Sequence, residues 1–446
     1  MDTFASCLSE NKASDNQAQL TNKPISIKES GIPGKVIESL LLKHLMQSTD
    51  EDTITLSHKL GLTGNIVDPV LQKLKSEALI EICSDGKYSR SLRYSLTVRG
   101  RQIAQHELQR DGYIGPAPIS LTHYQSLVLN QSTSKERVTP ELLRSGLNQL
   151  VLPENIIFKV GPALNSGRAI FIYGLPGTGK TYVSRRLVSL FNNDIFIPYS
   201  VCVGNQIIQV YDPILHKAVH TSTAATMRLD EGHDERLIRC KRPEVVVGGE
   251  LTAEMLEITF DATHRINRAP LQMKANNGIL LIDDLGRQKV AVDAILNRWI
   301  IPLEERIDYL ATASGEHFDI PFEQILVFSS NIHPAKLADD AFLRRIGYKI
   351  EFGPISREDY CQLWQQHCQQ FGLSTSTETL NFVINTLHQR QHIPLLPCYP
   401  RDLVSMCHNQ IKFTEQSPVI DQSLIELVWH CYFVDDQSTG VNHDER

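Results

Sequence analysis

Residues 174–181 combine glycines, a lysine and a hydroxyl in a spacing that can hold phosphate. The segment reads Gly174, Leu175, Pro176, Gly177, Thr178, Gly179, Lys180 and Thr181. Its glycines let backbone amides turn toward an anion without a clashing Cβ. Lys180 can reach phosphate oxygens as a point charge, and the Thr181 hydroxyl is a ligand type that Mg²⁺ accepts. A plain glycine-rich turn would not need this lysine and threonine, so we expect the segment to bind the phosphates of a nucleoside triphosphate.

Two adjacent carboxylates, Asp283 and Asp284, follow an apolar run at residues 279–282. A run that ends abruptly in acids is typical of a buried parallel strand whose carboxyl end opens onto a ligand site. Asp283 can hold a hydrated Mg²⁺, and Asp284 can orient or deprotonate an attacking water. Alone, the pair could be two solvated aspartates at the start of a turn; together with residues 174–181, it indicates hydrolysis of a nucleoside triphosphate.

Four more residues could act on the same phosphates. Asn331 ends an apolar run, where its amide could hold the attacking water. Arg344 and Arg345 end a predicted helix, and phosphoryl transfer gains from a cation that reaches the developing charge, often from a neighbouring subunit. A solvated helix end would explain these two arginines almost as well. Arg401, which follows a proline at the start of a later helix, could reach back over the nucleotide.

A parallel α/β sheet is needed to bring these side chains together. The apolar residues 171–173 predict a strand before the glycine segment, and apolar residues recur at helical spacing after it. We expect an α/β nucleotide-binding domain at residues 152–355. The helical pattern after Ser356, which opens with a capping box, predicts a lid at residues 356–435 and a tail at 436–446.

Composition limits the class of protein. The 446 residues suffice for about three domains, and a net charge of −7 implies no bulk attraction to nucleic acid or anionic membrane. The nine cysteines form no CxxC pair, which favours reduced thiols in a cytoplasmic protein. No apolar run approaches the ~20 residues that span a bilayer. The polar start lacks the apolar core of a signal peptide, and residues 1–31 are predicted to be a disordered tail.

Residues 32–107 predict a winged helix-turn-helix domain. Apolar residues at helical spacing are broken by a turn near Gly61, and two β-like segments follow. The wing carries Lys87, Arg90 and Arg93, but acidic residues nearly balance basic ones across the domain. Contact with DNA and docking of a protein both remain open. A connector is expected at residues 108–151.

Residues 200–270 have the composition of a β-rich insertion within the nucleotide-binding domain. An inserted loop could grip a partner or simply cover the sheet; we favour partner contact, since loops carry function more often than cores do. The histidines in this region lack metal-ligand spacing, so core or solvated histidines are the better interpretation.

The order of glycine segment, DD strand, SSN strand, LRR helix and PRD helix resembles that of AAA+ ATPases over residues 152–433. The resemblance implies a P-loop core with a parallel sheet and a C-terminal helical lid, here preceded by the winged helix. It assigns residues 174–181 as Walker A, Asp283 and Asp284 as Walker B, and Asn331 as sensor one. Arg344 or Arg345 would be the arginine finger and Arg401 sensor two.

The segment before Asn331 restricts the resemblance to particular groups of AAA+ ATPases. A helix ending in LEER and a probable hairpin at residues 307–318 are similar to the pre-sensor-one hairpin of MoxR-like ATPases, magnesium-chelatase subunits and enhancer-binding activators. The GAFTGA loop of the activators is absent, and Asp284 stands where the family usually has Glu.

The resemblance therefore implies a Mg²⁺-dependent ATPase that forms a homo-oligomeric ring and remodels a protein client. The alternative is an ATP-switched regulator or loader that binds DNA through its winged helix. A small-molecule enzyme that uses ATP directly would fit the two sensors and the lid less well.

Overall fold

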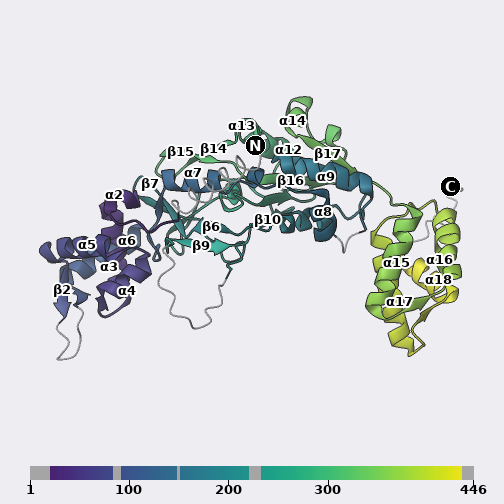
Figure 1. The fold of residues 1–446 in the computed structure, drawn as a ribbon, viewed down its shortest axis with the longest axis horizontal. Helices are drawn as coiled ribbons and strands as arrows, with labels where there is room; N and C mark the ends of the chain where they lie inside the picture. The colour runs from purple at the N-terminus through teal and green to yellow at the C-terminus, as the bar shows by residue number, and fades with distance from the viewer. Residues whose placement is uncertain (1–20, 84–91, 148–150, 220–232, 434–446) are drawn as a thin grey trace, which may run out of the picture.

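The computed structural model describes residues 21–83, 92–147, 151–219 and 233–433. An α/β body lies between a small N-terminal module and a C-terminal helical domain, and the molecule is elongated along this line (Figure 1). Within the described residues, no helix is long and apolar enough to cross a membrane.

A five-stranded parallel sheet forms the centre of the body. Its order is β10 (Glu244–Val247), β13 (Ile279–Ile282), β16 (Ile325–Ser330), β5 (Ile170–Gly174) and β17 (Tyr348–Phe352). β13 and β16 are buried along their whole length, as expected for parallel strands covered on both faces. The predicted α/β class with a parallel sheet and a C-terminal helical domain is confirmed.

Side chains alternate between two apolar cores on the faces of this sheet. Ile170 and Ile172 join one core, and Phe171 between them joins the other. The first core is covered by α8 (Pro140–Gly146), α9 (Glu154–Ser166), α10 (Lys180–Arg186) and η2 (Leu187–Leu190). The second is covered by η3 (Ala253–Leu256), α12 (Val292–Arg298), α13 (Ile300–Glu305), η4 (Pro334–Lys336) and α14 (Asp340–Arg345).

The expected insertion at residues 200–270 needs one correction. β10 lies inside that range, yet it pairs in parallel with β13 through Val246 and Leu281 and is therefore an edge strand of the central sheet. A short run of valines looks the same in an inserted sheet and in a central one, because only its long-range partner distinguishes the two.

Four other strands of this region build a second sheet with a strand of the connector. Its order is β11 (Thr259–Asp261), β12 (Ile266–Arg268), β8 (Gln206–Gln209), β7 (Ser200–Val203) and β4 (Ile119–Ser120). β4 comes from the predicted connector, as do α7 (Leu121–Asn130) and η1 (Thr133–Lys135); α11 (Leu271–Lys274) follows β12. Two further pairs are β6 (Ile195–Pro198) with β9 (Leu237–Cys240), and the hairpin β14 (Ile307–Ala311) with β15 (His317–Pro321). The hairpin lies where the sequence predicts one.

The N-terminal module, where the sequence predicts a winged helix-turn-helix, contains helices and a three-stranded antiparallel sheet. The elements are α3 (Gly34–Gln47), β1 (Glu51–Asp52), α4 (Thr53–Leu60), α5 (Gly64–Ser76), β2 (Ile80–Cys83), β3 (Arg93–Leu96) and α6 (Val98–Arg110). Lys87 and Arg90 of the predicted wing lie outside the described residues, whereas Arg93 is ion-paired with Asp50.

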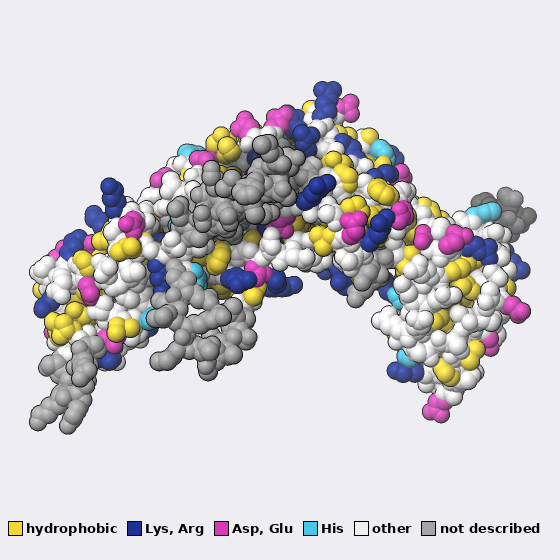
Figure 2. Space-filling model, viewed as in Figure 1, with side chains coloured by type: hydrophobic (Ala, Val, Ile, Leu, Met, Phe, Trp, Pro, Cys, Tyr) yellow, Lys and Arg dark blue, Asp and Glu magenta, His cyan; other side chains and the backbone are white. Residues whose placement is uncertain are grey.

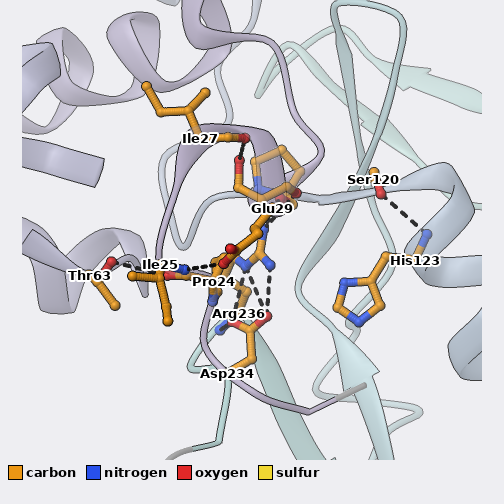
Figure 3. A network of polar contacts seen from close by, with 11 residues as sticks. Pro24, Ile25, Ile27, Glu29, Thr63, Ser120, His123, Asp234 and Arg236 are labelled. Atoms are coloured by element: carbon orange, nitrogen blue, oxygen red, sulfur yellow. Dashed lines mark hydrogen bonds and ion pairs between the residues drawn. The ribbon is translucent and has the colours of Figure 1, made fainter. Parts of the chain in front are cut away.

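Residues 21–31 differ from the expected disordered tail, because they lie between the module and the body. α2 (Ile27–Ser30) is capped by Ser26, whose hydroxyl accepts from Glu29 N. Figure 3 shows Arg236 beside Asp234 and the segment at residues 24–29. Arg236 donates to Ser30 O at 3.3 Å and to Pro118 O at 3.2 Å. Its guanidinium also pairs with Asp234 at 2.8 Å, and both side chains are buried. The segment is held by a buried ion pair that a tail-like composition does not reveal.

The C-terminal domain has its own apolar core, which includes Trp364 and Trp429. Its helices are α15 (Arg357–Phe371), α16 (Thr377–Phe382), the π-helical η5 (Val383–His388), α17 (Cys398–Thr414) and α18 (Gln422–Tyr432), with the short pair β18 (Ser374–Thr375) and β19 (Val419–Ile420). Ser356 caps α15 by accepting from Asp359 N, as the capping box predicts.

On the face shown in Figure 2, basic and acidic side chains are interspersed over the described surface. The described cysteines are all free thiols, and Cys202, Cys240, Cys368 and Cys407 are buried. No cluster of potential metal-ligating side chains of the His/Cys/Asp/Glu type occurs in the described ranges.

Candidate active site

The glycine segment forms a tight loop between β5 and α10. Gly174 has φ of 143°, and a Cβ there would lie 2.0 Å from Phe352 O, so only glycine fits beside β17. Gly177 and Gly179 have φ of 82° and 84°, a region that other residues rarely adopt. The loop therefore brings backbone amides and the N-terminus of α10 to one place, which suits an anion.

Lys180 is the central cation of this loop. Its Nζ donates to Leu175 O at 2.8 Å, to Gly174 O at 3.0 Å and to Asn331 Oδ1 at 2.8 Å. Burial lowers the pKa of Lys180, and the carboxylates of Asp284 and Asp283 oppose that shift. A desolvated ammonium interacts more strongly with an incoming anion than an exposed one does.

Thr181 and Asp283 lie together at the start of α10 and the end of β13. The Thr181 hydroxyl donates to Asp283 Oδ1 at 2.9 Å. Asp283 is fixed from the other side, since its backbone N–H donates to Val247 O at 2.7 Å. A hydroxyl beside a carboxylate is a hard-oxygen donor set, and these two side chains fit Mg²⁺.

Asp284 and Asn331 meet across the ends of β13 and β16. Asn331 Nδ2 donates to Asp284 Oδ1 at 3.3 Å. Asp284 adopts a left-handed backbone with φ of 50°, which Asp and Asn tolerate better than longer side chains do. This conformation gives a physical reason for aspartate where the AAA+ resemblance leads one to expect glutamate.

Sequence reasoning missed Gln288 beside these carboxylates. Its Nε2 donates to Asp283 O at 3.0 Å and to Asp284 O at 3.2 Å, and its Oε1 accepts from Gly286 N at 2.8 Å. The side chain closes the turn after β13 and holds the backbone of both aspartates. No spacing rule in the sequence points to this role.

A pocket of about 1030 Å³ extends from the glycine loop to the C-terminal domain. It is lined by residues of the loop, by Asp284 and Asn331, by α9 and by the facing sides of α15 and α17. Apolar side chains such as Ile156 and Leu363 line one part of it, which suits a nucleobase.

Arg401 lines this pocket from the first turn of α17. Its Nε donates to Asp402 Oδ1 at 2.8 Å, and that carboxylate is the main cause of its raised pKa. Asp402 also accepts from the Tyr432 hydroxyl at 3.0 Å. Arg401 is therefore oriented by a neighbour that sequence analysis did not single out.

Sequence analysis also did not predict that Cys398 contacts the glycine loop. A Cβ on Gly177 would lie 2.5 Å from Cys398 Sγ and 3.8 Å from Leu396 Cδ1. The start of α17 thus packs directly on the glycine loop, so a second reason for glycine at this position is contact with the lid.

Arg344 and Arg345 do not line the pocket of their own chain. Arg345 pairs with Glu304 at 2.9 Å and donates to Ala341 O at 2.7 Å. Arg344 is exposed and has no polar partner among the described residues. The two arginines, equivalent in the sequence, are thus distinguished by their contacts.

Comparisons with known proteins give information on the fold and none on the function. Residues 356–431 match the model of a domain of unknown function, DUF8689. No curated protein matches the chain. Solved structures with some likeness include the RuvB Holliday junction branch migration motor of Thermotoga maritima, at 12% identity and a TM-score of 0.38, covering 66% of this chain and 75% of that one.

Another is NtrX from Brucella abortus in complex with ADP, at 13% identity and a TM-score of 0.37, covering 73% of this chain and 59% of that one. At such identities and scores the likeness carries no functional information. The function has to be inferred from the geometry of the site.

Proposed function

We propose that this chain is an AAA+ ATPase that hydrolyses ATP in the pocket between the glycine loop and the C-terminal lid. The observation that carries the proposal is the convergence of Lys180, Thr181, Asp283, Asp284 and Asn331, from three different strand ends, into one hydrogen-bonded set. In the central sheet, whose order along the chain is 2-3-4-1-5, the neighbouring strands β13, β16 and β5 run parallel. Their carboxyl ends, which carry these residues, therefore lie at the same edge of the sheet.

Each residue then has a defined task. The loop amides and Lys180 bind the β and γ phosphates, and Thr181 and Asp283 hold Mg²⁺, which neutralises phosphate charge when bound. Asp284 accepts a proton from, or orients, the attacking water, and Asn331 fixes that carboxylate through its amide. Arg401 faces the phosphates from the lid.

The arginine finger in this proposal is Arg344, acting on the site of a neighbouring subunit. Arg345 is engaged by Glu304 within its own chain, whereas Arg344 is exposed and unengaged in the described structure. Because neither reaches the pocket of its own chain, a ring in which each subunit completes the next site would explain their position.

We further propose a MoxR-like role in which the ring remodels a protein client in the cytoplasm, with the N-terminal winged helix as adaptor. On α5, the helix that would read DNA in such a module, Asp68 and Pro69 are exposed, and Lys73 is paired with Glu38 at 2.6 Å. Glu77, directly after the helix, is also exposed. Lys75 is exposed on the same helix, but the acidic and neutralised groups outnumber it and suit a protein surface better than phosphates.

The rival role, an ATP-switched DNA regulator or loader, is favoured by Arg99 and Arg101. Both residues are exposed at the start of α6, and their guanidinium groups have no polar partner among the described residues. Duplex binding that is sensitive to salt and lost on reversing these two charges would support the rival.

Steady-state ATP turnover with matched variants tests the proposed activity. We expect Lys180→Ala to lose nucleotide binding, and Asp284→Asn to retain binding while turnover falls by about 10²–10⁴-fold. Turnover that survives both substitutions would refute the assignment of the site.

A further inference from the structure

A second pocket, of about 550 Å³, lies between α12 and the segment that follows β10. It shares no lining residue with the nucleotide pocket. Leu256 and Ile295 form buried parts of its wall, whereas Phe260 at its edge is 51% exposed. An exposed aromatic side chain beside an apolar hollow is typical of a recognition surface.

Hydrogen bonds brace the wall of this pocket. Gln272 Nε2 donates to Leu256 O at 2.7 Å and to Asp308 Oδ2 at 2.9 Å. Asp308 is fully buried, and its other oxygen accepts from Arg298 Nη1 at 2.5 Å. Because these contacts hold the wall in place, an occupant would not have to order it first.

The charged residues that line the pocket give its rim a negative balance. They are Glu254, Glu257 and Arg298. Arg298 is engaged by Asp308 and by Glu257, the latter at 2.8 Å. Glu254 is exposed, and its carboxylate has no polar partner in the described part of the chain. A positive group next to an apolar one would complement this arrangement.

The edge strand β11 runs along the same pocket. Thr259 and Phe260 line the pocket, and β11 is the outermost strand of its sheet, with β12 as its single partner among the described strands. An edge strand offers backbone groups to an extended segment from another protein. The shape, charge and strand edge therefore fit an extended peptide better than a folded surface.

We propose that this pocket binds an extended segment of a protein partner that carries a large apolar side chain next to lysine or arginine. The pocket is tied to the active site through the turn after β13. Gln288 binds the backbone of Asp283 and Asp284, and Val290, two residues later, lines the pocket. This link rests on the proposed ATPase function, and it predicts that the segment changes ATP turnover.

Fluorescence anisotropy on the full-length chain tests the binding. The labelled probe is Ser-Lys-Phe-Leu-Lys-Ser, with Ser-Glu-Phe-Leu-Glu-Ser and Ser-Lys-Ser-Ser-Lys-Ser as matched peptides. We expect the first to bind about tenfold more tightly than either of the others, since it alone meets both the apolar and the charge requirement.

Two variants locate the binding. Glu254→Lys should shift the preference toward the acidic peptide, and Ala294→Trp on the exposed face of α12 should weaken the basic peptide by more than about tenfold by filling the pocket. Asn409→Trp, on an exposed position of α17, is the control and should leave binding unchanged. Thermal melting confirms that each variant is folded.

The experiments distinguish failure of the peptide-binding proposal from failure of the proposed ATPase function. Equal binding of all three peptides, or binding that Ala294→Trp leaves unchanged, overturns the pocket assignment even if ATP is hydrolysed. Peptide binding of the expected selectivity in a chain without ATP turnover supports the pocket and refutes the ATPase. If Gln288→Ala leaves stimulation by the peptide intact, the proposed link is wrong.

Discussion

Lys180 Nζ lies 2.8 Å from Asn331 Oδ1, and Nδ2 of the same amide lies 3.3 Å from Asp284 Oδ1. One side chain thus accepts from the cation expected at the phosphates and donates to the carboxylate expected at the water. An amide can do both, whereas a carboxylate would offer no donor to Asp284. The Lys180–Asn331–Asp284 chain is the core of the proposed catalytic arrangement.

Asn331→Asp should slow ATP hydrolysis much more than it weakens ATP binding. The substitution keeps the shape but removes the donor and places a second negative charge beside Asp284. We expect kcat to fall by about 10²-fold, the size of effect seen when a positioned polar group is lost, while ATP affinity changes much less. An unchanged kcat would contradict the role given to Asn331.

Gly177→Ala should weaken nucleotide binding through the lid. The new Cβ would lie 2.5 Å from Cys398 Sγ, and φ of 82° is unfavourable for alanine. We expect the Kd for ATP to rise by about tenfold or more, for a cost of roughly 1–3 kcal/mol. Adding Cys398→Ala should recover part of the loss, since it removes the clash but not the strain. No recovery would show that the lid contact is unimportant.

Arg236→Met should destabilise the junction between the N-terminal module and the body. It leaves the buried carboxylate of Asp234 without its partner (Figure 3), and breaking a buried ion pair from one side costs about 3–5 kcal/mol. The control is Arg239→Met, which removes a half-exposed arginine from Asp194 but leaves that carboxylate paired with Lys241, and it should cost less than about 1 kcal/mol. Urea unfolding of both variants measures the difference, and similar losses would argue against the buried junction.

The lid should lose stability in acid because of His388. Burial lowers its pKa from 6.5 to about 4. Its Nε2 faces the Tyr360 hydroxyl at 3.0 Å, and its Nδ1 faces Ile393 O at 3.1 Å. Between those two pKa values the unfolded chain binds more protons than the folded one, so stability is complete above about pH 6.5 and falls as pH decreases toward 4.

The loss approaches about 3 kcal/mol at the acid end of that window. Trp364 and Trp429 lie in the lid and report its unfolding by fluorescence. His388→Gln removes the titrating group, so its stability should depend less on pH across the same range. A variant whose pH dependence equals that of the unmodified chain would exclude His388 as the cause.

Short sequence patterns were sufficient to predict the phosphate loop and the acidic pair Asp283 and Asp284. Glycines that need unusual φ, a lysine, a hydroxyl and an apolar run ending in Asp283 are all visible within short segments. Their convergence could also be anticipated, since parallel strands end at one edge of a sheet.

Long-range pairing explains what the sequence did not reveal. The partner of β10, the engagement of Arg345 by Glu304 and the packing of Cys398 on Gly177 all join residues far apart in the chain or on different elements. Arg344 and Arg345 are neighbours on one helix, so the sequence alone gives them equal claims to the same role. The ion pair of Arg345 with Glu304 distinguishes them. Residues 21–31 looked like a tail because the buried contacts that hold α2 are made by Arg236.

Mixing two inactive variants tests the shared active site most directly. Lys180→Ala subunits would lack a usable nucleotide site but retain Arg344, and Arg344→Ala subunits would retain the site but lack the finger. If each subunit completes its neighbour's site, the mixture should regain ATP turnover well above either variant alone, because an arginine finger supplies about 10³–10⁵-fold in rate. A mixture as inactive as its components, or an Arg344→Ala variant that is fully active by itself, would contradict the ring with Arg344 as its finger.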